Sequence, residues 1–188
     1  MAPRIVVAHG YLASPEKHWF PWLVEQYGAE IVSVPALPDP KAPQLDAWLD
    51  TLRAAIGEVD DDTVLIGHSL GSVTTLRVLD SLPRPWTLGG LIIVAGFAEP
   101  LPNLPQLDPF TVPPLDLAPL VGSIRQRQVF GSDNDTTVDP SVTAALAKAI
   151  DAPLTILPGR GHFVERQGCR AIAELIPVIN RMLPIHNA

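Results

Sequence analysis

The sequence predicts a three-layer α/β fold, in which helices cover both faces of a mostly parallel six-stranded sheet. Two patterns carry this prediction. Short apolar runs alternate along the chain with segments of helical periodicity, as in sheets that are buried on both faces. A glycine-flanked serine motif, residues 67–71 (GHSLG), joins one apolar run directly to a helical segment. With 188 residues, 47% of them hydrophobic and 18% charged, the chain is expected to form one globular domain over residues 1–188.

Each strand is assigned to a short apolar run and each helix to a periodic segment between two such runs. The run TVLI before the serine motif is β-rich and reads as a buried strand, and the residues after the motif read as the helix to which it connects. Strands are expected at residues 4–8, 30–34, 63–66, 90–95, 126–130 and 154–157. Helices are expected at residues 15–27, 45–57, 70–82, 140–150 and 168–183.

The last two helices carry further signals. Asp139-Pro140 is typical of an N-cap residue followed by the first helical position. In the final helix, Pro177 should kink or split the chain near its middle. That helix has a core-facing stripe at i, i+3, i+4 spacing, formed by Ile172, Leu175, Ile176, Ile179 and Leu183.

Residues 96–119 are unusually rich in proline, and this density forbids a regular helix or sheet. Because the segment follows the fourth strand, it should lie at the carboxyl edge of the sheet, where open α/β folds bind ligands. Two interpretations stand side by side. The segment is either a stiff loop that forms part of a substrate pocket in place of a helical lid, or a surface connection made rigid for stability.

The serine motif has the form of the nucleophile elbow of α/β-hydrolases, a strand, then G-x-S-x-G, then a helix. The turn is so sharp that a side chain at Gly67 or Gly71 would collide with a neighbouring strand or helix. The strained turn lifts the hydroxyl of Ser69 above the sheet edge and aims the helix N-terminus at the reaction centre. Ser69 is therefore the candidate nucleophile.

A serine hydroxyl needs a base to remove its proton, and the base needs an acid to orient it. In α/β-hydrolases the chain order is serine, then aspartate or glutamate, then histidine. His162 follows the last expected strand in a glycine-flanked loop, and it is the histidine that fits this order. It is therefore the candidate base.

Three aspartates compete for the position of the acid after the strand that ends at Phe130. Asp135 is favoured because Val138 follows three residues later, as in this loop of α/β-hydrolases. Asp133 is the runner-up and could instead orient a turn through its side chain. Asp139 fits the helix N-cap better.

The oxyanion hole of such a site is formed by two backbone N–H groups. One is expected from Leu70, which follows the nucleophile, and the other from Tyr11 after the first strand, with Leu12 as the alternative. The substrate pocket is expected to involve Gly10, His68 and Phe97. Trp19, Trp22 and Phe97 could line the pocket, but they could equally be core aromatics.

Several classes of function are disfavoured by composition. A net charge of -7 argues against a nucleic-acid partner, and no apolar run is long enough to span a membrane. Neither metal-ligand spacing nor a P-loop or dinucleotide motif occurs, so no cofactor and no metal are expected. The single cysteine, Cys169, and the absence of a signal-peptide pattern predict a cytoplasmic location. No acidic or basic cluster adjoins the motifs, which disfavours a strongly charged substrate.

Taken together, these residues resemble a group of small, lidless α/β-hydrolases that includes the bacterial YdeN-like proteins and the retinoblastoma-binding serine hydrolases of animals. The resemblance covers nearly the whole chain, and the most specific block is HWFPWL at residues 18–23. It implies an α/β-hydrolase fold without a helical lid domain, and it implies that the second aspartate of the S-x-x-D stretch, Asp135, is the triad acid. Relatives generally carry proline where this chain has Asp139. The L-x-C-x-E motif of the animal proteins does not occur around Cys169, so their pocket-protein contact is not carried over.

The leading hypothesis is a serine hydrolase that cleaves small, short-acyl esters through a Ser-Asp-His triad and an acyl-enzyme. Thioester and amide substrates are not separated from esters by the sequence. The alternative is a weakly active or inactive protein of the same fold with a binding or regulatory role, since a fold is often retained after its catalytic activity has been lost. Every catalytic position carries the required residue type, which favours the enzyme.

Overall fold

A computed structural model describes residues 2–183, and its centre is one six-stranded sheet in which every strand pair is parallel. The strand order is β2-β1-β3-β4-β5-β6. The strands are β1 (Arg4–Ala8), β2 (Val32–Ser33), β3 (Thr63–His68), β4 (Leu88–Val94), β5 (Ile124–Gly131) and β6 (Leu154–Ile156). The predicted α/β architecture is confirmed, and all six strands lie within a few residues of their expected positions.

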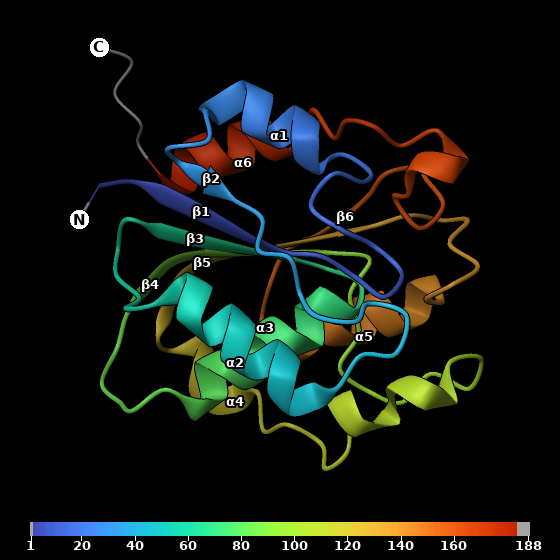
Figure 1. The fold of residues 1–188 in the computed structure, drawn as a ribbon, viewed down its shortest axis with the longest axis horizontal. Helices are drawn as coiled ribbons and strands as arrows, with labels where there is room; N and C mark the ends of the chain where they lie inside the picture. The colour runs from blue at the N-terminus through green and yellow to red at the C-terminus, as the bar shows by residue number, and fades with distance from the viewer. Residues whose placement is uncertain (1, 184–188) are drawn as a thin grey trace.

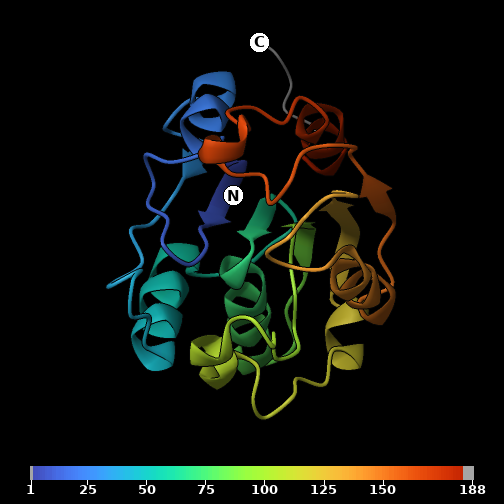
Figure 2. The ribbon, with the colours of Figure 1, turned by 90° about the vertical axis from the view of Figure 1, so that its right-hand side faces the viewer.

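Helices cover both faces of this sheet (Figure 1). On one face lie α1 (Phe20–Tyr27) and α6 (Leu175–Met182), and on the other lie α2 (Leu45–Ile56), α3 (Leu70–Ser81), α4 (Ala118–Val121) and α5 (Pro140–Ala149). Figure 2, seen from the right-hand side of Figure 1, shows the same three layers. Two short 3₁₀ helices, η1 (Pro105–Phe110) and η2 (Glu165–Gln167), lie in the connections. None of the helices within residues 2–183 has the length and apolar character needed to span a membrane.

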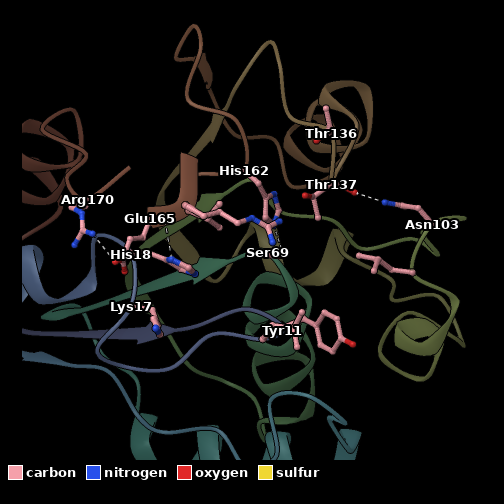
Figure 3. A pocket seen from close by; sticks show the side chains of 14 residues that line it. Tyr11, Lys17, His18, Ser69, Asn103, Thr136, Thr137, His162, Glu165 and Arg170 are labelled. Atoms are coloured by element: carbon pink, nitrogen blue, oxygen red, sulfur yellow. Dashed lines mark hydrogen bonds and ion pairs between the residues drawn. The ribbon is translucent and has the colours of Figure 1, made fainter. Parts of the chain in front are cut away.

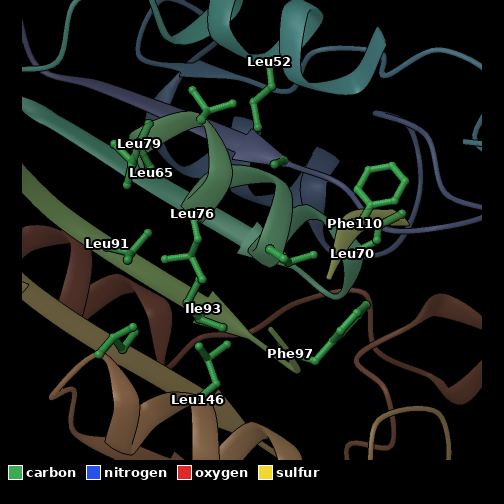
Figure 4. Packing of buried hydrophobic residues seen from close by; sticks show 14 of the residues in the cluster. Leu52, Leu65, Leu70, Leu76, Leu79, Leu91, Ile93, Phe97, Phe110 and Leu146 are labelled. Carbon is green, nitrogen blue, oxygen red and sulfur yellow. The ribbon is translucent and has the colours of Figure 1, made fainter. Parts of the chain in front are cut away.

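Alternate residues of each central strand face opposite layers, so the sheet separates two hydrophobic cores. On β3, Leu65 packs toward α2, α3 and α5, whereas Val64 and Ile66 pack toward α1 and α6. Figure 4 shows the first of these cores, in which Leu76 of α3 points toward Ile93 of β4. This burial on both faces explains why the strands read as continuous apolar runs.

The first and last helices begin later than predicted. Helix α1 begins at Phe20 rather than residue 15, because His18 has a positive φ of 60° that the helix cannot include. Helix α6 begins at Leu175 rather than residue 168, and Gly168 before it is left-handed with a φ of 84°. Pro177 is the third helical residue, where its missing N–H removes no intrahelical bond. The predicted kink in mid-helix was therefore wrong.

The proline-rich segment is more ordered than its composition predicts. It contains the 3₁₀ helix η1 and the start of α4, although residues 96–119 were expected to hold no regular helix. Several of its apolar side chains, including Leu107 and Phe110, are buried in the core beside α3. The segment thus packs as part of the core-covering layer, and no helical lid domain is inserted anywhere within residues 2–183.

Candidate active site

Ser69 lies in a strained turn between β3 and α3. Its φ of 54° and ψ of −123° are outside the regions that non-glycine residues normally adopt. The turn is held from both sides. The Ser69 N–H donates to the carbonyl of Val94 on the neighbouring strand at 3.0 Å, and the Ser72 N–H donates to the carbonyl of Ser69 at 2.9 Å. This arrangement places the serine at the carboxyl edge of the sheet, directly before the N-terminus of α3.

The two glycines of the motif are required by close packing around this turn. A Cβ atom at Gly67 would lie 2.6 Å from the Cα of Ser72, and one at Gly71 would lie 2.1 Å from the carbonyl oxygen of Ala8. Both distances are shorter than any real contact of a Cβ atom. The collision expected from the sequence is therefore confirmed, with the following helix at Gly67 and with strand β1 at Gly71.

The structure brings Ser69, His162 and Asp135 together from three separate strand ends. The Nε2 atom of His162 lies 2.9 Å from the Oγ of Ser69, and its Nδ1 lies 2.7 Å from the Oδ2 of Asp135. All three residues are at most 7% exposed. Because a carboxylate only accepts hydrogen bonds, Nδ1 carries the proton that faces Asp135, and Nε2 is left free to accept the proton of the Ser69 hydroxyl.

Asp135 is fixed by its own backbone neighbours. Its Oδ1 accepts hydrogen bonds from the N–H groups of Thr137 at 2.8 Å and Val138 at 3.1 Å, which leaves Oδ2 for His162. The rival Asp133 is exposed, and its Oδ1 accepts from the N–H of Gly159 instead. Asp139 caps α5 by accepting from Ser141, as predicted. The geometry thus separates the three aspartates that the sequence left in competition.

Side chains of the β5 loop hold the loop that carries His162. Asn134 accepts from the N–H of Gly161 at 2.8 Å, and Ser132 accepts from the N–H of Arg160 at 3.0 Å. The N–H of His162 itself donates to Gln167 at 2.7 Å. These bonds fix the position of the imidazole, which a loop without partners could not do.

Two backbone N–H groups at the site have no acceptor among residues 2–183, namely those of Tyr11 and Leu70. The alternative donor, Leu12, is occupied because its N–H bonds to the carbonyl of Pro40 at 2.8 Å. His9 holds this loop in place, since its Nε2 accepts from the N–H of Leu37 at 3.0 Å. Tyr11 is therefore the donor that remains available after β1.

His68 lies beneath the site rather than on its wall. Its Nε2 donates to the carbonyl oxygen of His162 at 2.9 Å, and its buried Nδ1 has no partner within the described chain. Burial lowers the pKa of His68 well below its usual value, and the nearby His162 and His18 add to this effect. His68 therefore remains neutral and supports the backbone of the His162 loop.

The other predicted pocket residues also lie off the cavity wall. Phe97 and Trp19 are fully buried in the two cores, and Trp22 packs against the second core. Gly10 lies beside the nucleophile, where a Cβ atom would be 2.9 Å from the Cβ of Ser69. Gly10 thus gives room to Ser69 without contributing a side chain.

A cavity of about 610 Å³ opens over Ser69 and His162 (Figure 3). The proline-rich segment contributes Asn103 and Leu104 to it, as one of the two interpretations of that segment proposed. The other lining residues are Tyr11, Leu12, Lys17, His18, Thr136, Thr137, Val164, Glu165, Arg166 and Arg170. Sequence reasoning missed the charged members of this set, and the expectation that no basic cluster adjoins the motifs was wrong.

His18 is the lining residue with the most unusual environment. Its Nδ1 accepts a hydrogen bond from the N–H of Glu165 at 3.1 Å. Burial lowers the pKa of His18 to about 4; the carboxylate of Glu165 opposes this shift, whereas His162, Lys17 and Arg166 add to it. At neutral pH His18 is therefore an uncharged imidazole with its proton on Nε2.

Within residues 2–183, no group of three or more His, Cys, Asp or Glu side chains is arranged to hold a metal ion. Cys169 is buried, and burial raises the pKa of its thiol to about 11. Cys169 is therefore a protonated thiol at neutral pH.

The chain is similar to known proteins in sequence and in fold. The serine hydrolase family matches residues 5–181 of the chain. YdeN of Bacillus subtilis (strain 168), which bears the name of a hydrolase, is 38% identical over 181 residues, with 95% of each chain covered. The crystal structure of the ydeN product from B. subtilis superposes with a TM-score of 0.91 at 37% identity, covering 96% of this chain and 98% of that one. A YdeN-like protein from Pectobacterium atrosepticum shares the fold at 18% identity, with a TM-score of 0.71 and coverage of 96% and 91%.

Proposed function

The chain belongs to the serine hydrolase family, and from this premise we propose that it is a carboxylesterase-type enzyme that cleaves small, short-acyl esters through an acyl-enzyme. The observation that carries the proposal is the continuous pair of hydrogen bonds from Asp135 through His162 to Ser69, at 2.7 and 2.9 Å. These distances are those required for proton transfer between a nucleophile and its base.

The first half of the reaction forms the acyl-enzyme. The Oγ of Ser69 bonds to the ester carbonyl carbon while His162 Nε2 takes the hydroxyl proton, and Asp135 stabilises the imidazolium that results. The carbonyl oxygen becomes an oxyanion, which the free N–H groups of Tyr11 and Leu70 would stabilise. The bond to the alcohol oxygen then breaks, and His162 returns its proton to the departing alcohol.

The second half releases the acid. A water molecule gives a proton to His162 and bonds to the acyl carbon, and the same two N–H groups stabilise the second oxyanion. The bond to Ser69 then breaks, and the serine oxygen regains its proton from His162. This cycle needs only groups of the chain, the ester and water.

The shape of the site supports small substrates. A cavity of about 610 Å³ is within the range of pockets that hold small molecules, and no lid domain within residues 2–183 extends it into a long apolar tunnel. Its wall mixes polar and charged side chains with the aliphatic side chains of Leu12, Leu104 and Val164. Short acyl groups therefore fit this cavity better than long lipid chains.

The test is labelling by a fluorophosphonate probe, followed by assays with 4-nitrophenyl esters of increasing acyl length. We expect the native protein to be labelled at one site, and labelling to be lost in both Ser69→Ala and His162→Ala. Hydrolysis should be fastest for acetate to butyrate esters. Folded native protein that neither reacts with the probe nor cleaves any ester would contradict the proposal and favour a binding role.

A further inference from the structure

The cavity differs in charge on the two sides of Ser69 (Figure 3). On one side lie uncharged residues, among them Asn103, Thr136 and Thr137. The other side carries the charged residues, which come from two segments far apart in the sequence, residues 17–18 and 165–170. We call the side formed by Lys17, His18, Glu165, Arg166 and Arg170 the basic wall.

The basic wall has an excess of positive charge. Arg170 forms an ion pair with Glu165 at 2.7 Å, so these two charges largely offset each other. Lys17 and Arg166 form no ion pair with any residue in the range 2–183. Two cations without an ion-pair partner in this range thus border the active site of a chain whose net charge is -7.

The acidic residue next to Lys17, Glu16, interacts with it electrostatically but forms no ion pair with it among residues 2–183. Glu16 is adjacent in sequence, but it does not line the cavity, and its carboxylate accepts a hydrogen bond from the Ser14 hydroxyl at 2.7 Å. A cleft lined by charges of one sign concentrates ligands of the opposite sign, and the low dielectric of its walls strengthens this effect.

His18 adds a directed hydrogen-bond donor to these two charges. Because its Nδ1 accepts the N–H of Glu165, its proton lies on Nε2, and this N–H has no acceptor among residues 2–183. The ring is held by contacts with the rings of Phe20 and His68, each with centroids 5.6 Å from its own, and the backbone of His18 has a φ of 60° that is uncommon outside glycine. A strained residue that presents an unpaired donor to a cavity is typical of a binding site.

We propose that Lys17, His18 and Arg166 form a subsite for an anionic group, a carboxylate, on the ester that the enzyme cleaves. The proposal rests on the esterase function inferred above and narrows its substrate class. The carboxylate would accept a hydrogen bond from His18 Nε2 and lie within the field of the two cations. It could belong to the acyl half or to the alcohol half of the ester, and the test separates these two sources.

The test uses two pairs of chromogenic esters as substrates. For the acyl half, 4-nitrophenyl hemisuccinate is compared with neutral 4-nitrophenyl pentanoate. For the alcohol half, 3-carboxy-4-nitrophenyl acetate is compared with 4-nitrophenyl acetate. The readout in each pair is the ratio of kcat/KM for the anionic ester to kcat/KM for the neutral one, which cancels changes in the amount of active enzyme.

In one of the two pairs, we expect the ratio of the native protein to be about three times that of Lys17→Gln or of Arg166→Gln. It should be about ten times that of the double variant. His18→Phe keeps an aromatic ring beside Phe20 but removes the donor, and it should lower the same ratio. Raising the salt concentration to about 0.5 M should do so as well, because salt screens exposed charges. Lys148→Gln, an exposed lysine on α5 away from the cavity, is the matched control and should leave the ratio at its native value.

The outcomes separate this inference from the function on which it rests. If neutral esters are cleaved but both ratios are the same in the native protein and in the double variant, the subsite is refuted and the esterase function stands. If only the first pair responds, the carboxylate belongs to the acyl half, and if only the second responds, it belongs to the alcohol half. If no ester is cleaved and the fluorophosphonate probe does not react, both proposals fall together.

Discussion

Replacing Asp135 by asparagine tests the proposed triad with little change of shape. Asparagine is isosteric with aspartate, and its carbonyl oxygen can still accept from the N–H groups of Thr137 and Val138. Its amide NH₂ would then occupy the position of Oδ2, 2.7 Å from His162 Nδ1. Because an amide NH₂ donates, Nδ1 would have to accept, and the imidazole proton would move to Nε2.

A proton on Nε2 faces Ser69 and prevents His162 from taking the serine proton. For a triad in which the tautomer is reversed in this way, kcat falls by about 10⁴-fold. That factor corresponds to about 5 kcal/mol of lost transition-state stabilisation. We therefore expect Asp135→Asn to lower kcat for 4-nitrophenyl acetate by about 10³- to 10⁴-fold, while the melting temperature changes little.

The matched control is Asp133→Asn in the same loop. Among the described residues, the Asp133 carboxylate accepts one hydrogen bond, from the N–H of Gly159, and an asparagine oxygen can accept that bond equally well. The activity of Asp133→Asn should stay within about twofold of native, because Asp133 is not bonded to His162 and does not determine which of its nitrogens carries the proton. The proposed triad is refuted if Asp135→Asn keeps more than a tenth of native activity, or if Asp133→Asn loses as much activity as Asp135→Asn does.

Three further results are expected. Gly10→Ala should lower kcat by about 10- to 100-fold in the same ester assay, because its Cβ would lie 2.9 Å from the Cβ of Ser69 and displace the nucleophile; native activity would contradict this. Cys169 should resist Ellman's reagent at pH 8 in the native protein and should react after the protein is unfolded in urea, because burial raises the pKa of its thiol to about 11. Rapid reaction of the native protein would contradict this prediction. Lowering the pH from about 6.5 to 5 should reduce the free energy of unfolding, measured in urea, because the unfolded state protonates a histidine that stays neutral when folded. For His68, whose pKa is lowered by burial, the free energy of unfolding should fall by about 1.4 kcal/mol per pH unit. If His68→Gln showed the same dependence on pH as the native protein, the contribution of His68 would be refuted.

The parts of the fold that local chemistry determines were predictable from the sequence. The nucleophile turn needs glycine at residues 67 and 71 because backbone atoms of Ser72 and Ala8 approach too closely for any side chain. Such a requirement leaves a direct trace in the sequence. The strands were equally visible, since burial on both faces leaves continuous apolar runs.

The predicted start of the last helix was wrong because its hydrophobic stripe continues into the preceding loop. Ile172 fits the helical spacing of the stripe in α6, and it is fully buried, yet it lies before the helix begins at Leu175. Burial alone therefore does not distinguish a helix from a loop packed on the core. The signal that could have corrected the boundary was the pair of Gly168, at a left-handed turn, and Pro177, which favours the first turn of a helix.

The pocket was the least predictable part, because proximity in sequence to a motif does not place a side chain in a cavity. Phe97 follows β4 closely, but its ring is fully buried in the core. The basic wall was invisible for the opposite reason. His18 and Glu165 are 147 residues apart and meet only through the hydrogen bond between His18 Nδ1 and a backbone N–H. No pattern in a single sequence records a contact of this kind.

The clustering of histidines gives a physical reason for assigning His162 as the base. The rings of His18 and His162 both lie close to that of His68, with centroids 5.6 and 5.2 Å away. Burial lowers the pKa of His18 and His68, and neither ring is hydrogen-bonded to a carboxylate, so neither readily takes up a proton. Only His162 bonds to one, that of Asp135. Among these three neighbouring imidazoles, the ring bonded to Ser69 is therefore the one in which a direct hydrogen bond to a carboxylate stabilises the transient positive charge of the proposed reaction.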